Sequence, residues 1–401
     1  MDIHQSSNTL TLSEAPVVHY LQQTWELAAL LRASDIHFEP FENFFRVRLR
    51  IDGVLQEIPP PPFEFKEQIV SRIKVLSRLD IAEKRLPQDG RMNLGLKNTQ
   101  HLNLRVSTLP TLFGEKIVVR ILSTDLAKLN LDHLGYSAAD KQKLLDAIQK
   151  PHGMILVTGP TGSGKSQSLY ACLNLLNRVE VNIASVEDPS EIQLLGINQV
   201  NVKEKIGLNF ATSLRAFLRQ DPDILMVGEI RDHETADIVM KASQTGHLVL
   251  STLHTQDAPN ALVRLRNMGV ATYNLASSIS LISAQRLVRR LCMHCRTPIS
   301  VSSQLLKELG LHSFKDQNSH HFYSAQGCSQ CHKGYWGRIG LFQVMPITAA
   351  LQHLILHNAS GPELTAQAEK EGVCTLRHAG LVQASLGITS LSEVLAHTDV
   401  T

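Results

Sequence analysis

Apolar residues near the start of the chain recur at two different spacings. Between residues 13 and 32 they return every three or four positions, which predicts an amphipathic helix. In "FRVRLRI", residues 45–51, four apolar residues alternate with three arginines. This alternation predicts a strand with one buried face and one basic face. A second amphipathic helix is predicted over residues 64–80, and two further strands over residues 101–106 and 115–122.

The pattern changes at residue 136, where short runs of almost continuous apolar residues begin to alternate with helical stretches. The runs are "MILVTG", "NIASVED", "DILMVGE" and "HLVLST". A strand that is apolar along its whole length is buried on both faces, which is typical of a mostly parallel sheet in an α/β domain. The cysteine pairs follow this domain, and the end of the chain has a mostly helical pattern.

These patterns predict five regions, and a chain of 401 residues suits two or three domains. The regions are an N-terminal α+β domain (1–122), a linker (123–135), an α/β domain (136–285), a cysteine-containing region (286–340) and a helical C-terminal region (341–401).

Composition narrows the function classes. The formal net charge is +2, which argues against dedicated nucleic-acid binding, where a strong basic excess is expected. The N-terminal residues lack the basic start and apolar run of a signal peptide, and no apolar run is long enough for a membrane span. We therefore expect a soluble, cytoplasmic protein that docks on a membrane complex through partner proteins.

The sequence "GPTGSGKS" fits the phosphate-loop pattern between a predicted strand and a predicted helix. Its residues are Gly159, Pro160, Thr161, Gly162, Ser163, Gly164, Lys165 and Ser166. Backbone N–H groups of such a loop surround phosphates, and the following helix N-terminus adds partial positive charge. Lys165 is expected to reach the β- and γ-phosphates of ATP, and Ser166 to bind Mg²⁺. A chance Gly-rich turn is the alternative, but the strand, loop and helix stand in the required order.

Two acidic residues end predicted strands of the same domain. Glu229 follows the apolar run 224–227, where a Walker-B carboxylate holds Mg²⁺ or its water, and Glu187 ends the strand "NIASVE". One carboxylate could hold the metal while the other activates water for in-line attack. Helix capping is a credible alternative for the neighbouring Asp188 and Glu191.

Two histidines bracket the strand in "TGHLVLSTLHT", His247 before it and His254 after it. A lone histidine is more often structural than catalytic. Two histidines beside the nucleotide strands suggest sensors that hydrogen-bond the γ-phosphate or the acidic residues.

Four cysteines form two C-x₂-C pairs, Cys292 with Cys295 and Cys328 with Cys331, with 32 residues between the pairs. This is the ligand arrangement of a closed tetrahedral Zn²⁺ site, although the intervening loop is longer than usual. A redox pair would need a different fold context, and disulfides are disfavoured in the cytosol. His294 and His332 are neighbours that could replace a ligand. The isolated Cys172 and Cys374 are expected to be buried apolar residues.

Together these motifs resemble one family, the secretion ATPases of type II secretion systems and type IV pilus assembly. The resemblance rests on the phosphate loop, "VEDPSE", "ILMVGEIRD" and "TGHLVLSTLHT", and upstream on "ASDIHFEP", "RIDGVL", "RLPQDGR" and "LRVSTLPTLFGEKIVVRIL". It covers roughly residues 30 to 345. It implies a homohexamer of RecA-like ATPase domains, each preceded by a small PAS-like α+β domain.

The resemblance also implies roles for single residues. Arg91, Arg105 and Arg120 would supply guanidinium groups to the ATP phosphates. Glu187 and Glu229 carry over as the water-activating and Mg²⁺-associated carboxylates, without settling which takes which role. His247 and His254 carry over as γ-phosphate sensors.

The resemblance further implies a motor that acts on an inner-membrane platform protein. Assembly and secretion motors of the family carry the four cysteines and retraction motors lack them, so the cysteines favour an assembly or secretion motor. Longer members have an extra N-terminal docking domain, whereas this sequence starts shortly before "ASDIHFEP". We therefore expect platform contact through other surfaces. The alternatives are a DNA-transfer or conjugation-type secretion ATPase and an ATP-binding scaffold with little turnover.

Overall fold

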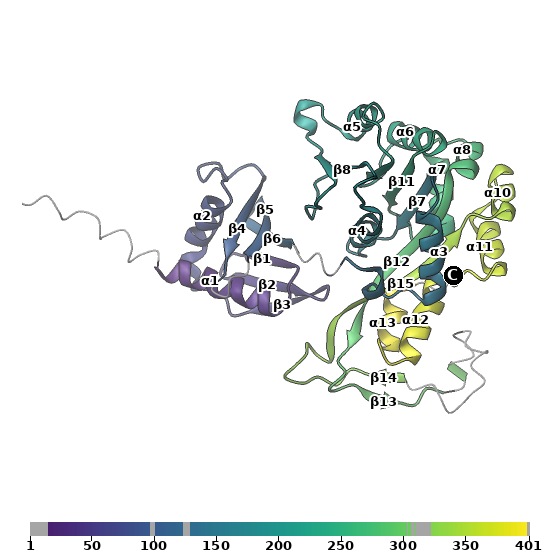
Figure 1. Cartoon of the computed structure of the whole chain (residues 1–401). Coiled ribbons are helices and arrows are strands. Elements are labelled where there is room, and N and C mark those ends of the chain that lie inside the picture. The colour runs from purple at the N-terminus through teal and green to yellow at the C-terminus, as the bar shows by residue number, and fades with distance from the viewer. Residues whose placement is uncertain are drawn as a thin grey trace, which may run out of the picture. The chain divides into compact units, whose positions relative to one another are not determined.

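The computed structural model describes residues 15–96, 101–122, 129–302, 304–305, 309 and 322–398. The chain forms two compact units, Met1–Thr124 and Asp125–Thr401 (Figure 1). Each unit has its own hydrophobic core, and each is described by itself. Residues 123–128 of the linker expected at 123–135 lie outside the described residues.

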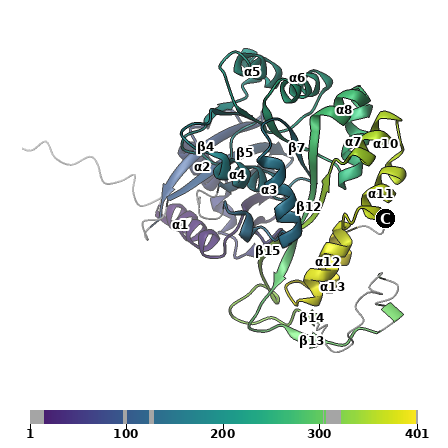
Figure 2. The same ribbon diagram turned by 45° about the vertical axis from the view of Figure 1, so that its right-hand side comes forward.

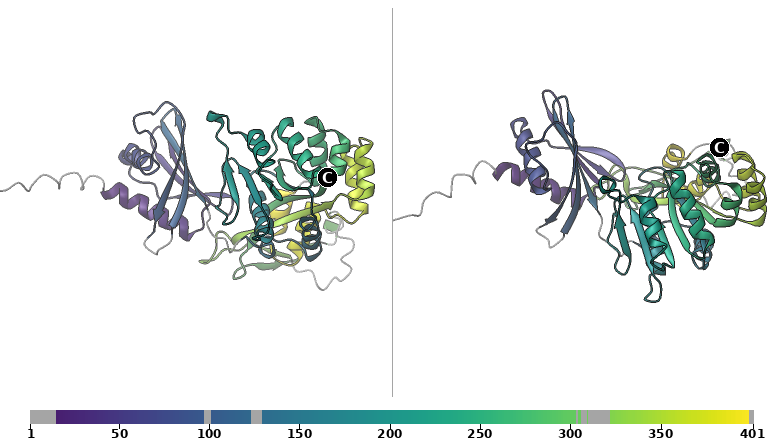
Figure 3. Two further views of the ribbon diagram at one scale, coloured as in Figure 1. Left: turned by 45° about the horizontal axis from the view of Figure 1, so that its top comes forward. Right: turned by 90° about the horizontal axis from the view of Figure 1, so that it is seen from above.

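The first unit is an antiparallel sheet with helices on one face. Its strand order is β3-β2-β1-β6-β5-β4. The strands are β1 (Asp35–Pro40), β2 (Phe45–Ile51), β3 (Val54–Ile58), β4 (Gln88–Gly95), β5 (His101–Thr111) and β6 (Gly114–Leu122), and the helices are α1 (Ala15–Leu30) and α2 (Lys66–Leu76). Both helices lie against the same face of the sheet (Figure 3). Trp25 of α1 packs edge-on against Phe38 of β1, with ring centroids 6.0 Å apart.

Two features of this unit differ from the expectation. The helix expected over 64–80 begins with a 3₁₀ turn, Phe63–Phe65, and α2 ends at Leu76. Arg78 follows with a φ of 58°, which an α-helix cannot contain. Strands β1, β3 and β4 were not expected. In β1 the polar residues Asp35, His37 and Glu39 alternate with the core residues and are nevertheless buried.

The second unit is built on a seven-stranded sheet with the order β15-β12-β7-β11-β10-β8-β9. Its strands are β7 (Gly153–Thr158), β8 (Ile183–Glu187), β9 (Asn198–Asn201), β10 (Ile224–Val227), β11 (Leu248–Leu253), β12 (Ile279–Leu291) and β15 (Tyr335–Pro346). All neighbouring strands are parallel except β15, which runs antiparallel to β12. The mostly parallel sheet expected from the apolar runs is confirmed.

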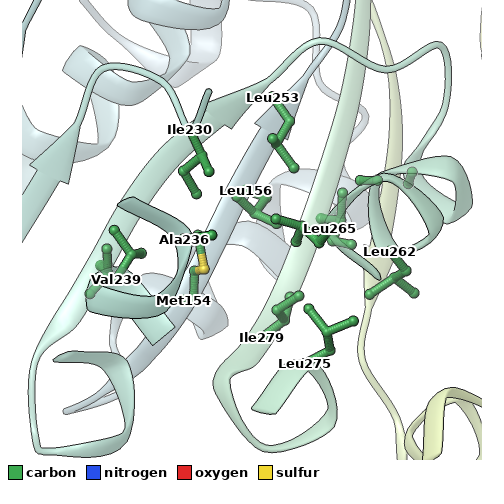
Figure 4. Packing of buried hydrophobic residues seen from close by; sticks show 14 of the residues in the cluster. Met154, Leu156, Ile230, Ala236, Val239, Leu253, Leu262, Leu265, Leu275 and Ile279 are labelled. Atoms are coloured by element: carbon green, nitrogen blue, oxygen red, sulfur yellow. The ribbon is translucent and has the colours of Figure 1, made fainter. Parts of the chain in front are cut away.

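Helices cover both faces of this sheet. They are α3 (Ala138–Ile148), α4 (Lys165–Leu176), α5 (Phe210–Phe217), α6 (His233–Gln244), α7 (Ala258–Asn267) and α8 (Thr272–Ser278). One core cluster joins the sheet to α3 and α4, and another joins it to α5, α6, α7 and α8. Figure 4 shows the second cluster, where Met154 and Leu156 of β7 point towards Ala236 of α6 and Leu265 of α7.

Strands β12 and β15 form a long ribbon that leaves the sheet. The ladder runs from the pair Leu281–Pro346 to Leu291–Tyr335, whereas β12 pairs with β7 only as far as Ala284. The region boundaries expected at residues 286 and 341 therefore fall inside two continuous strands.

The cysteine pairs and the short strands β13 (Thr297–Ile299) and β14 (Phe322–Ser324) follow at the far end of the ribbon. The C-terminal helices are α10 (Ala349–Leu356), α11 (Gly361–Lys370), α12 (Leu376–Ser385) and α13 (Leu391–His397). Helices α12 and α13 lie beside the ribbon (Figure 2). Of the helices within the described residues, none is both long enough and apolar enough to cross a membrane.

Candidate active site and tetracysteine cluster

The phosphate loop joins β7 to α4 at the carboxyl end of the parallel sheet. Gly162 and Gly164 have φ values of 79° and 88°, a region that side chains with a Cβ rarely adopt. Gly164 is also the N-cap of α4, so the helix begins directly after the loop. The glycines thus let the chain turn sharply, and the α4 N-terminus is placed where an anion would be stabilised.

The ammonium group of Lys165 is held over its own loop. Its Nζ donates to the carbonyl oxygens of Gly159 at 2.8 Å and Pro160 at 3.0 Å. Burial lowers the pKa of Lys165 to about 8, although the nearby negative charge of Glu229 opposes this shift. Ser166 is the second residue of α4 and is partly buried.

Glu229 lies just beyond β10 in a cluster of charged groups. Arg231 donates from Nε to Oε1 of Glu229 at 2.7 Å and also contacts Asp188 at 3.2 Å. On its other oxygen, Oε2, Glu229 lies 3.3 Å from Nε2 of His254, the residue that follows β11. The carboxyl ends of β8, β10 and β11 thus bring together two acids, an arginine and a histidine.

Glu187 is in a different environment from Glu229. It is 4% exposed and accepts three hydrogen bonds: from the hydroxyl of Tyr170, from Ser185 Oγ at 2.7 Å and from Gln199 Nε2 at 3.1 Å. Burial, with the charge of Glu187, raises the pKa of Tyr170. The oxygens of both glutamates have protein partners, and the two differ in exposure: Glu187 is buried, whereas the side chain of Glu229 is 22% exposed.

His247 lies at the opposite end of β11 from His254. Leu248 pairs with Gly153 and Leu253 with Thr158, so the amino end of β11 is beside the start of β7. Seven steps of about 3.3 Å per residue separate the two histidines by about 23 Å. His247 Nδ1 lies 3.0 Å from the carbonyl oxygen of Ala242 near the end of α6. Within this chain His254 alone of the two therefore lies at the phosphate-loop end, and the role of both histidines as γ-phosphate sensors stays a prediction.

The three arginines expected to contact phosphates are neighbours in the N-terminal unit. Arg91 of β4 pairs with Arg105 of β5, and Arg105 with Arg120 of β6. Arg120 continues the row to Asp35 of β1, to which it donates from Nε at 2.9 Å. Their strand neighbours Met92, Leu104 and Val119 are buried in the core under the helices, so the arginines lie on the other face. A row of adjacent guanidinium groups favours a polyanionic ligand.

The four cysteines come together at the far end of the β12–β15 ribbon. All four Sγ atoms lie within 4.8 Å of one another, with distances of 3.9 Å for Cys292–Cys328 and 3.6 Å for Cys295–Cys331 and Cys328–Cys331. Four sulfurs about 2.3 Å from one Zn²⁺ in a tetrahedron would be about 3.8 Å apart. The separations fit this geometry and are too long for disulfides.

Backbone N–H groups donate to two of the four sulfur atoms. Gly327 N donates to Cys295 Sγ at 3.3 Å, and Cys328 N to Cys331 Sγ at 3.2 Å. Burial opposes ionisation of Cys331, but the hydrogen bonds outweigh it and lower its pKa to about 7.

The remaining cysteines and histidines near the cluster fall outside it. Among the described residues, the potential metal-binding group contains the four thiols and neither His294 nor His332. Cys172 is buried in α4 as expected. The expectation that Cys374 is buried is wrong, because it is exposed in the turn between α11 and α12.

Three residues near the loop were not singled out from the sequence. Tyr170 stands in the apolar run of α4, where an aromatic residue is usually explained by packing. Arg231 was part of a quoted motif without a role of its own. Gln285 donates from Nε2 to the carbonyl of Ser163 at 2.6 Å. The sequence around Gln285, "LISAQRLV", also contains Ser283 and Arg286, so it gave no distinct signal for this residue.

Comparisons with known proteins identify the family of this chain. A family model described as type II/IV secretion system protein matches residues 11–396. The type IV pilus assembly ATPase PilB of Acinetobacter baylyi is 51% identical over 383 residues, which cover 95% of this chain and 66% of that relative. Type II secretion system protein E of Aeromonas hydrophila is 45% identical over 399 residues, which cover 99% of this chain and 79% of that relative.

A solved structure supports the fold. The Legionella pneumophila ATPase DotB superposes with a TM-score of 0.68 at 19% identity, over 97% of this chain and 96% of that one. Because the family model spans nearly the whole sequence and relatives from both machines align along it, the chain belongs to the ATPase family of type II secretion and type IV pilus assembly.

Proposed function

We propose that this chain hydrolyses ATP at the phosphate loop and that hydrolysis drives assembly of a pilus or pseudopilus, or type II secretion. The observation that carries the proposal is the convergence of the Lys165 loop with the Glu229–His254 pair at one end of the sheet. The relatives named as a pilus assembly ATPase and a type II secretion protein support the biological role. The chain spans about two thirds of the length of the pilus-assembly relative.

The two glutamates receive different roles in this proposal. A group that accepts a proton from attacking water needs an oxygen that water can reach. Glu229 is partly exposed and has a histidine partner, so we assign the attacking water to Glu229. Glu187 is buried and accepts three hydrogen bonds, so we assign it a structural role. Its hydrogen bond from Tyr170 links β8 to α4.

The phosphates would be held by the loop and by Lys165. Ser166 would hold Mg²⁺, which neutralises phosphate charge when bound, and Glu229 would be associated with the metal through its water. His254 would orient Glu229 and hydrogen-bond the γ-phosphate. Arg91, Arg105 and Arg120 would add guanidinium groups from the N-terminal unit, where their shared row suits phosphate oxygens.

The wider setting is proposed from the family. We infer a cytoplasmic homohexamer that contacts an inner-membrane platform protein and is membrane-associated through it. The four cysteines would hold a structural Zn²⁺ whose role is to fold the end of the ribbon.

Phosphate release by the purified chain tests the proposal. The wild type should release phosphate from ATP in the presence of Mg²⁺. Lys165→Ala should abolish release while leaving the fold intact, as judged by circular dichroism. Binding of ATP without release by the wild type would favour the scaffold alternative, and unchanged release by Lys165→Ala would remove the phosphate-loop assignment.

A further inference from the structure

Gln285 reaches the phosphate loop from the neighbouring strand. Thr158, the last residue of β7, pairs with Ala284 of β12, so Gln285 lies beside the first residue of the loop. The residue is 2% exposed. A buried amide is unfavourable unless its donor and acceptor both have partners.

Both ends of the Gln285 amide are satisfied by the loop and the helix that follows it. Nε2 donates to the carbonyl oxygen of Ser163 at 2.6 Å, and Oε1 accepts from Ser168 Oγ at 2.8 Å. Ser168 is 1% exposed and lies in the first turn of α4. The carbonyl of Ser163 can only accept, so the amide orientation is fixed with nitrogen towards the loop.

Gln285 also restricts which residues can stand at two positions of the loop. A Cβ on Gly159 would lie 2.5 Å from the carbonyl oxygen of Gln285, and a Cβ on Gly164 would lie 3.2 Å from its Nε2. Both ends of the loop are therefore in close contact with this one residue.

The hydrogen bond to Ser163 has a consequence for phosphate binding. In a trans peptide the carbonyl and the following N–H point in opposite directions. Because Gln285 holds the carbonyl of Ser163, the N–H of Gly164 points to the opposite side of the peptide. Gly164 N–H belongs to the α4 N-terminus, where anions are bound.

We propose that Gln285 is a positioning residue for phosphate binding, because its amide holds the Ser163–Gly164 peptide in the orientation that presents the Gly164 N–H to the nucleotide. The inference rests on the proposed nucleotide site. It predicts that Gln285 acts on the affinity for phosphates beyond its contribution to the stability of the core.

A matched control lies on the adjacent strand. Gln343 of β15 is 4% exposed and pairs with Ala284. Its Oε1 accepts from the backbone N of Ala258 at the start of α7, at 2.9 Å. Gln285→Ala and Gln343→Ala thus remove the same amide from neighbouring buried positions, but the first removes a hydrogen bond to the loop and the second a hydrogen bond to α7.

The test compares ADP binding by isothermal titration calorimetry with the melting temperature of each nucleotide-free variant. We expect both variants to melt at lower temperature by similar amounts. ADP affinity should fall about tenfold or more in Gln285→Ala and by less than about twofold in Gln343→Ala. Unchanged ADP affinity in Gln285→Ala, or an equal loss in both variants, would overturn the inference.

ADP binding by a third variant and by the wild type covers the case in which Gln285→Ala does not fold. Ser168→Ala removes one partner of the amide and should weaken ADP binding in the same direction by a smaller factor, which tests the inference even if Gln285→Ala does not fold. Unchanged binding in Ser168→Ala together with an unfolded Gln285→Ala would count against it. If the wild type itself fails to bind ADP, the proposed function fails instead.

Discussion

The Nε2 atom of His254 lies 3.3 Å from Oε2 of Glu229, across the carboxyl ends of β11 and β10. Neither residue is near the other in sequence, and the parallel register of the two strands brings them together. We predict that His254→Ala lowers kcat for ATP hydrolysis by about 10²-fold, because Glu229 loses the group that orients it.

His247 provides the control for this prediction. It lies at the other end of the same strand and contacts the carbonyl of Ala242. His247→Ala should therefore leave kcat within about threefold of the wild type, an effect within the range of an ordinary surface change. Equal losses of kcat in the two variants would show that the loss comes from a change in strand β11 and not from the missing contact with Glu229.

Substitution of the two glutamates should affect different properties: the stability of the fold for Glu187 and the rate of ATP turnover for Glu229. Glu187→Gln introduces an amide that must face three donors, so we expect a loss of about 1–3 kcal/mol in the free energy of unfolding. Glu229→Gln should leave the urea midpoint nearly unchanged and reduce phosphate release by at least about 10²-fold. Urea denaturation and steady-state phosphate release measure both effects. The reverse pattern would exchange the proposed roles.

The lowered pKa of Lys165 predicts a pH-dependent affinity. With a pKa of about 8 the ammonium loses its proton as pH rises through that value, below the ordinary value of 10.5. Phosphate binding favours the charged form, so ADP affinity should fall and proton uptake on binding should appear as pH rises above about 8. Calorimetry in two buffers of different ionisation enthalpy measures the uptake.

Lys165→Ala should show no such proton uptake, which identifies the group. The same shift affects the nucleotide-free chain in the opposite sense. Between about 8 and 10.5 the unfolded chain binds more protons at this residue, so its contribution to stability rises with pH. An affinity that is constant from neutral pH to about pH 9 would contradict the prediction.

The cysteine cluster predicts about one zinc per chain, measured by mass spectrometry of the metal. Removal of the metal by a chelator should increase hydrogen exchange around Cys292, Cys295, Cys328 and Cys331, because the metal holds the end of the ribbon. Cys328→Ser should have the same effect. Cys374→Ser is the control, since Cys374 is exposed and outside the cluster, and should retain the zinc.

The row of arginines predicts that loss of one guanidinium group affects the turnover of ATP more than the affinity for ATP. Arg105→Ala should lower kcat more than it lowers ATP affinity, because guanidinium groups contribute most when phosphate charge develops in the transition state. Arg85→Ala removes an arginine that is 87% exposed and ion-paired with Glu83, and should change neither quantity appreciably. A loss of affinity alone in Arg105→Ala would make it a ground-state binder.

The sequence was sufficient to predict the parallel sheet and the phosphate loop. Strands such as β7 and β10 are apolar along their whole length, and the loop glycines stand directly between a strand and a helix. The spacing of the four cysteines was equally direct. These features depend on local patterns, which a single sequence displays.

The features that were missed depend on contacts between distant segments. Strand β1 was not expected, and its polar residue Glu39 is buried by contacts with Arg46, Arg48 and Lys116 of other strands, which its own short sequence does not show. The bonds of the Gln285 amide span 117 and 122 residues. The separation of His247 from His254 could not be read from their motif either, because the strand between the two residues places them at its opposite ends.

Strand β12 carries Gln285 at the point where it leaves β7, and it continues for six residues as a two-stranded ribbon that ends beside Cys292. A paired strand cannot slide by one residue without turning every side chain to the opposite face. We therefore expect a displacement of the cysteine end to reach the phosphate loop through this backbone, which is about 20 Å in length. Strand β12 thus connects the end of the ribbon beside the cysteines directly to Gln285, the residue that hydrogen-bonds the phosphate loop.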